Sequence, residues 1–241
     1  NLPEWISRVA WLSRIIGAAR GASGLSLPTF DLMLAMMERG LAPAVPTYGS
    51  IGTSDLVLSA QMGATLLGEG EIWDNGVCRP AAEALRSHGL APIKLAPKDG
   101  LALANNSSFS IALASQALRE AHSTMDLAQA VTVLSGEGYG MNPSIFEARI
   151  HALRPAASQE QAATWFRAAL EGSSLYASGA PRSIQDALSF RVAAPLFGTA
   201  SNALALAEKE TEIELNGAAD NPAVLHETSE MLSTPNFHTP A

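Results

Sequence analysis

Apolar residues recur at three- and four-residue spacing along most of the chain, as in helices that bury one face. This spacing predicts helices over roughly 4–20, 28–39, 106–134, 158–171 and 190–215. Pro28 suits a first helical turn and Gly40 a helix end, whereas Pro195 is expected to bend or open the last helix. Another helix follows Ser54, a natural N-cap residue. The pattern predicts a mainly α protein whose long helices pack as a bundle.

One short stretch has the pattern of a β-hairpin. Two apolar segments flank Asp74-Asn75-Gly76, and Asn-Gly suits a turn that requires positive φ. No internal repeat, low-complexity tract or linker divides the sequence, so we expect residues 1–241 to form a single, mostly helical domain with a small β-hairpin excursion. Because the first residues already have helical spacing and no start Met precedes them, we expect a fragment of a longer chain.

Composition narrows the class of partner. The chain has 47% hydrophobic residues and a formal net charge of -8, so it can bury a sizeable core but offers no basic stripe for nucleic acid. The single cysteine, Cys78, cannot form an internal disulfide, and no apolar run reaches membrane-spanning length. The histidines lack metal-ligand spacing, so we expect no metal site. We expect a cytoplasmic protein that binds a small molecule.

The segment from Gly49 to Leu56, Gly-Ser-Ile-Gly-Thr-Ser-Asp-Leu, has the most specific chemistry in the sequence. Taken alone, Ser54 is a helix cap. The longer segment resembles the Gly-Ser-Val-Gly-Ala-Ser-Gly-Asp-Leu motif of the histidine and phenylalanine ammonia-lyase family. In that family Ala-Ser-Gly cyclises and dehydrates to a methylidene-imidazolone (MIO). A helix N-terminus would stabilise negative charge on such a ring.

By this resemblance Thr53, Ser54 and Asp55 are the candidate catalytic residues. Thr53 stands at the family's Ala, Ser54 matches its Ser, and the following Gly is missing, so Asp55 comes directly after Ser54. Ring closure needs a compressed turn that Gly reaches more easily than a residue with a Cβ. Two explanations remain open: a processed residue is missing from the sequence, or this is a member that lacks the cofactor.

Further stretches of the chain match the family and supply the candidate substrate-binding residues. The resemblance places Asn105 and Arg191 at the substrate carboxylate, Gln185 near the electrophile and Phe237 beside the cofactor; Arg makes a bidentate clamp that Lys does not reproduce. Leu188 departs from the family pattern, because it stands where the family has a Tyr. The other matches, among them Asn216, Asp220 and Asn221, resemble turn and interface scaffold.

Three functions remain open. The first is elimination of ammonia from an aromatic or imidazole L-amino acid, giving an arylacrylate such as urocanate or cinnamate, with a general base from outside the given chain. The second is an MIO-independent elimination of trimethylamine from a histidine betaine, as in an ergothionase, which would need neither a Gly after Ser54 nor a Tyr at Leu188. The third is a non-catalytic helical homologue. The resemblance also implies a homotetramer whose active sites neighbouring chains complete.

Overall fold

The computed structural model describes residues 1–49, 52 and 54–235. These residues form two compact units, the first drawn from the described residues of 1–116 and 209–235 and the second made of residues 117–208. Two long helices, α6 (Ser108–Tyr139) and α10 (Ala193–Asn216), belong partly to each unit. The predicted fold class, mainly α with long helices and small β excursions, is confirmed. Whether the two units associate into the single domain expected from the sequence stays a prediction.

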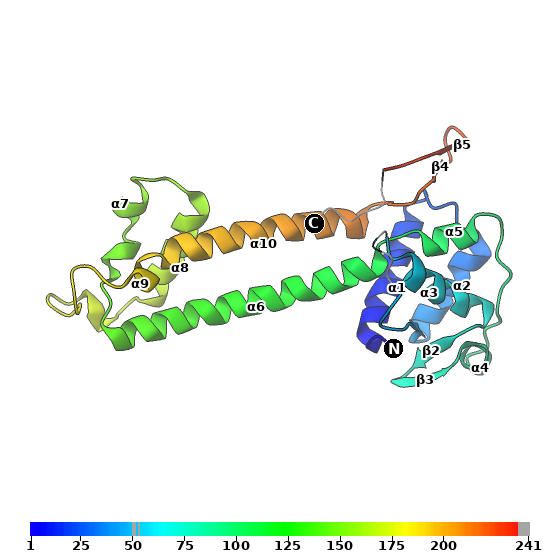
Figure 1. Cartoon of the computed structure of the whole chain (residues 1–241), viewed down its shortest axis with the longest axis horizontal. Coiled ribbons are helices and arrows are strands. Elements are labelled where there is room, and N and C mark those ends of the chain that lie inside the picture. The colour runs from blue at the N-terminus through cyan, green and yellow to red at the C-terminus, as the bar shows by residue number, and fades with distance from the viewer. Residues whose placement is uncertain (50–51, 53, 236–241) are drawn as a thin grey trace. The chain divides into compact units, whose positions relative to one another are not determined.

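The first unit contains an apolar core built in part from α1 (Glu4–Ala19) and α2 (Leu27–Glu38). Figure 1 shows these two helices side by side. Trp11 in α1 is buried, and its indole Nε1 donates to the Met33 carbonyl at 3.1 Å, which joins α1 to α2. The helices of this unit, besides its parts of α6 and α10, are α1 (Glu4–Ala19), α2 (Leu27–Glu38), α3 (Leu56–Ala64), the 3-10 turn η1 (Thr65–Leu67), α4 (Ala81–Ser87) and α5 (Asp99–Ala104).

Short strands complete the first unit. The predicted hairpin is present as β2 (Glu71–Asp74) and β3 (Val77–Pro80), with positive φ at both Asn75 and Gly76. The edge strand β1 (Leu41–Ala44), which pairs with β2, was not predicted from the sequence. Neither was a second hairpin, formed by β4 (Ala223–Leu225) and β5 (Glu230–Leu232).

The second unit has its own apolar core. In it the rings of Phe146 and Phe166 stack with their centroids 4.6 Å apart, and the ring centroid of Phe197 lies 5.6 Å from that of Phe166. Besides its parts of α6 and α10 it contains η2 (Pro143–Phe146), α7 (Ala148–His151), α8 (Ala157–Ala169), η3 (Ser174–Tyr176) and α9 (Leu188–Arg191).

The helix predicted over 190–215, with a bend or opening at Pro195, is interrupted one turn before this residue: α9 ends at Arg191 and α10 starts at Ala193. Pro195 therefore lies in the first turn of α10, where a missing N–H removes no intrahelical hydrogen bond.

Candidate functional site

The turn before α3 brings Ser54 and Asp55 into an unusual conformation. Ser54 has a positive φ of 45°, and Asp55 occupies the N-cap position without a side-chain capping bond. The expectation that Ser54 caps this helix was therefore wrong. The Asp55 carboxylate instead accepts hydrogen bonds from Ser110 N and Ser110 Oγ, both at 2.8 Å, and the Asp55 N–H donates to Asn106 O at 2.9 Å. These contacts attach the start of α3 to the start of α6.

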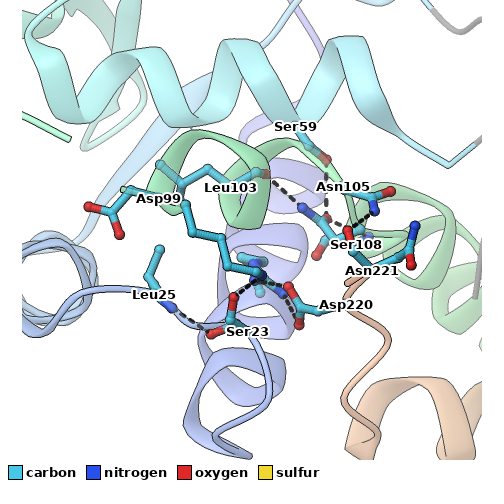
Figure 2. A network of polar contacts seen from close by, with 12 residues as sticks. Ser23, Leu25, Ser59, Asp99, Leu103, Asn105, Ser108, Asp220 and Asn221 are labelled. Atoms are coloured by element: carbon cyan, nitrogen blue, oxygen red, sulfur yellow. Dashed lines mark hydrogen bonds and ion pairs between the residues drawn. The ribbon is translucent and has the colours of Figure 1, made fainter. Parts of the chain in front are cut away.

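Asn105 lies beside this turn, at the C-terminal end of α5, and its side chain is buried. Its Oδ1 accepts from Ser54 Oγ at 3.3 Å, while its Nδ2 donates to Asn221 O at 2.9 Å. Figure 2 shows Asn105 and Asn221 facing each other, although they are 116 residues apart in sequence. The structure thus brings together Ser54, Asp55 and Asn105 among the predicted site residues.

The neighbouring Asn106 holds the backbone around the site and was not assigned this role from the sequence. Its Oδ1 accepts from Ser59 Oγ and from Ser108 N, both at 3.1 Å, and its Nδ2 donates to Leu103 O at 2.7 Å. A buried amide with both ends bonded fixes the connection from α5 to α6. The pair Asn105-Asn106 followed by Ser is the sequence signal that could have indicated it.

Asp99 anchors the other end of α5. Its buried carboxylate accepts from Ser26 N, Ser26 Oγ, Thr29 Oγ1 and Ala96 N at 2.7–2.8 Å. Burial by itself raises the pKa of Asp99, but the hydrogen bonds from Ser26, Thr29 and Ala96 outweigh it, and the pKa lies below its usual value. The carboxylate is therefore ionised at neutral pH and connects the start of α5 to the start of α2.

Gln185 and Arg191 lie in the second unit, and they contact each other. With its amide oxygen turned toward the guanidinium, Gln185 accepts from Arg191 Nη2 at 3.1 Å and from Nη1 at 2.5 Å. Both side chains are exposed, as is Leu188. Ser54, Asp55 and Asn105 belong to the first unit, so a common role of all these residues around one substrate, as the resemblance implies, stays a prediction.

The segment that carries Gln185 is anchored by the residue that follows it. Asp186 is buried, and its carboxylate accepts from Asn142 N at 2.6 Å and from Ser183 Oγ at 3.0 Å. Asn142 Nδ2 in turn donates to Ile184 O at 3.1 Å. Asp186 was not assigned a role from the sequence, and in the structure it ties this segment to the chain just after α6.

Two candidate residues, Thr53 and Phe237, lie outside the described residues. Within the described part of the chain, no three His, Cys, Asp or Glu side chains are grouped as metal ligands would be. None of the helices in residues 1–49, 52 and 54–235 combines the length and the apolar character needed to cross a bilayer.

Comparison with known proteins matches residues 1–241 to the sequence model for aromatic amino acid lyases. The chain belongs to the aromatic amino acid lyase family. This chain is 37% identical over 236 residues to a histidine ammonia-lyase of Chloroflexus aurantiacus, an alignment that covers 96% of this chain and 45% of the relative. The chain therefore spans less than half the length of this relative.

Two of the solved structures with a similar fold illustrate the likeness. Histidine ammonia-lyase from Trypanosoma cruzi superimposes with a TM-score of 0.87 at 31% identity, over 99% of this chain and 44% of that one. Ergothionase from Treponema denticola, in complex with desmethyl-ergothioneine sulfonic acid, superimposes with a TM-score of 0.90 at 28% identity, over 97% of this chain and 47% of that one.

Proposed function

We propose that the full-length protein is a carbon–nitrogen lyase that eliminates ammonia from an aromatic or imidazole L-amino acid, giving an arylacrylate such as urocanate or cinnamate. Family membership and the 37% identity to a histidine ammonia-lyase support this proposal.

The observation that carries the proposal is the state of Arg191. Its guanidinium is exposed and has the neutral amide of Gln185 as its partner, and among the described residues it forms no ion pair with a carboxylate. A neutral partner orients the guanidinium without compensating its charge, which leaves that charge for a ligand carboxylate. We assign Arg191 to the substrate carboxylate, with Asn105 as a second donor and Gln185 as the residue that orients Arg191.

The residues around Ser54 do not fit the MIO of the family. Formation of the ring requires the nitrogen after Ser54 to attack the preceding carbonyl. Here that nitrogen belongs to Asp55 and donates to Asn106 O at 2.9 Å, while the Asp55 carboxylate is held by Ser110. Closure would break these contacts and force a residue with a Cβ into a turn that suits Gly. Formation of the ring would need a Gly after Ser54 in the native chain.

This junction favours a second candidate, elimination of trimethylamine from a histidine betaine. A quaternary nitrogen has no N–H with which to form an amine adduct, and it leaves without one. The similarity to an ergothionase supports this candidate. The candidate carboxylate-binding residues, Arg191 and Asn105, would serve either substrate, so the two candidates differ in the leaving group and not in substrate anchoring.

Turnover and intact mass, measured on the full-length protein, test both candidates. L-histidine, L-phenylalanine, hercynine and ergothioneine are supplied separately, and ammonia, trimethylamine and the arylacrylate are quantified. Ammonia release by a protein two waters lighter than its encoded mass supports the first candidate. Trimethylamine release by a protein of unmodified mass supports the second. Release of neither amine from any of the four compounds contradicts the lyase proposal.

We also propose that the protein is a cytoplasmic homotetramer that binds only small-molecule substrates. The acidic composition and the lone Cys78 support a reducing compartment and argue against nucleic acid. Exposed apolar side chains on α6, Leu127, Val131 and Leu134, recur at the spacing of one helix face, which supports burial between chains.

A further inference from the structure

Asp220, which directly precedes Asn221 in the sequence, belongs to a buried ion pair. The Asn221 carbonyl is the one that accepts from Asn105. Arg14 in α1 and Asp220, 206 residues later, are 3% and 1% exposed. Arg14 Nη2 donates to Asp220 Oδ1 at 2.7 Å, and Nη1 donates to Oδ2 at 3.2 Å. Figure 2 shows Asp220 and Asn221 on the same stretch of chain, with Asn221 turned toward Asn105.

Stability alone does not account for this pair. Removing two charges from water costs about as much as their attraction returns, and apolar residues of similar volume are often as stable. The pair is also incompletely satisfied, since Arg14 Nε is buried without a hydrogen-bond partner among the described residues. Lys98 is a second cation that interacts with Asp220. Burial lowers the pKa of Lys98, and the negative charge of Asp220 opposes that shift. Lys98 Nζ donates to Ser23 O. What the pair does supply is a fixed, two-point geometry.

That geometry extends to Asn221 through the backbone and Thr234. Asp220 O accepts from Thr234 Oγ1 at 2.9 Å, and Asn221 Oδ1 accepts from Thr234 N at 2.8 Å. With the Asp220 side chain held by Arg14 and its carbonyl held by Thr234, the next carbonyl, that of Asn221, has a defined direction. This carbonyl accepts from Asn105 Nδ2 at 2.9 Å.

The Asn221 carbonyl decides which end of the Asn105 amide faces which neighbour. A backbone carbonyl only accepts, so Nδ2 must face Asn221; the hydroxyl of Ser54 can donate or accept and would tolerate either orientation. In the observed orientation Asn105 keeps a second N–H on Nδ2 for a ligand carboxylate. If the Asn221 carbonyl moved away, the amide could flip and present its oxygen to that carboxylate, which would repel it.

We propose that Arg14 and Asp220 are positioning residues that orient the Asn105 amide for the substrate carboxylate by fixing the Asn221 carbonyl. The inference rests on the carboxylate-binding role assigned to Asn105 in the proposed function. Arg14 and Asp220 do not touch the substrate.

The test replaces the pair in the full-length protein by apolar residues of similar volume, Arg14→Met with Asp220→Leu. This double variant should be about as thermostable as wild type, because neither charge remains buried alone. Its KM should nevertheless rise roughly 10- to 100-fold, with a smaller change in kcat, as expected for a lost hydrogen bond to a charged ligand. Asp220→Asn alone should lower thermostability, because it leaves Arg14 uncompensated.

A double-mutant cycle separates positioning from a purely structural role. In an Asn105→Ala background, replacement of the Arg14–Asp220 pair should raise KM no further, because the amide that the pair orients is gone. An equal rise in KM with and without Asn105 would overturn the proposal, as would a wild-type KM in a folded Arg14→Met, Asp220→Leu variant. If the double variant does not fold, Arg14→Lys serves in the same cycle, because it keeps the charge and loses the two-point geometry.

A crystal structure of the variant used in the cycle keeps this inference distinct from the lyase proposal. We expect the Asn105 Nδ2 to Asn221 O distance to exceed hydrogen-bonding range. A retained bond would contradict the positioning role even if no substrate is turned over. A lost bond in a protein that releases no amine would support the positioning role and reject only the proposed function.

Discussion

At the scale of single residues, the two candidate carboxylate-binding side chains are prepared differently. Arg191 is exposed and oriented by the neutral amide of Gln185. Asn105 is 6% exposed and bonded at both ends of its amide, to Ser54 and to Asn221. The cation thus keeps its charge available, whereas the amide is held in one orientation. Carboxylate binding by these residues would depend on the fixed orientation of the Asn105 amide, and on both the charge and the planar fork of Arg191.

Arg191→Lys tests the bidentate role. The variant keeps the positive charge but loses the planar fork and the contact with Gln185, so KM for the amino-acid or betaine substrate should rise by roughly 10- to 100-fold. Steady-state kinetics on the full-length protein measure it. Arg149→Lys is the matched control, because Arg149 is 83% exposed and pairs with Glu147 at the surface. An unchanged KM in the Arg191 variant would remove this residue from the site.

At the scale of elements, tight backbone contacts hold helices together in both units. In the first unit α3 and α5 approach so closely that a Cβ on Gly63 would lie 3.0 Å from Leu103 Cβ. In the second unit a Cβ on Gly198, in α10, would lie 2.7 Å from Gln159 N and 2.8 Å from Ser158 C, both at the start of α8. Backbone atoms cannot rotate away as side chains do, so α8 or α10 would have to shift.

Gly198→Ala should therefore lower the free energy of unfolding by about 1–3 kcal/mol, the usual cost of overpacking. Gly138→Ala is the control: Gly138 lies in α6, and no atom of the described residues would lie within 4 Å of an added Cβ. That substitution should be neutral or stabilise by about 0.5–1 kcal/mol through helix propensity. Urea denaturation followed by circular dichroism measures both. Equal effects of the two substitutions would show that α8 and α10 are not packed at this contact.

At the scale of the whole molecule, the α6 face is the clearest sign of association. Leu127, Val131 and Leu134 are 65%, 50% and 71% exposed and lie at four- and three-residue spacing. Exposure of such a row of apolar side chains to water is unfavourable, and burial against another chain lowers the free energy. This is the physical support for the proposed homotetramer.

Leu134→Glu tests this assembly. A charge buried at an interface is costly, so light scattering on the full-length protein should show a tetramer for wild type and smaller species for the variant. Leu153→Glu is the control, because Leu153 is 86% exposed outside that row and its substitution should leave the assembly intact. A wild-type monomer, or a tetramer unaffected by the Leu134 change, would contradict the proposal.

Local sequence was sufficient for features that depend on neighbouring residues. The helices α1, α2 and α8 and the Asn75-Gly76 hairpin follow from apolar spacing and turn chemistry, and the fold class follows from them. The Gly49–Leu56 motif led to the family, which the comparisons confirm. These signals are readable because helix periodicity and turn sterics act over a few residues.

Tertiary structure alone decided how polar groups are paired over long distances in the sequence. Ser54 was expected to cap α3, yet Asp55 takes that position and bonds Ser110, 55 residues away. The pairing of β1 with β2 and the Arg14–Asp220 ion pair were likewise invisible in sequence patterns. The physical reason is that a buried hydrogen-bonding group must find a partner wherever the folded chain brings one near, and local propensity holds no information about that partner.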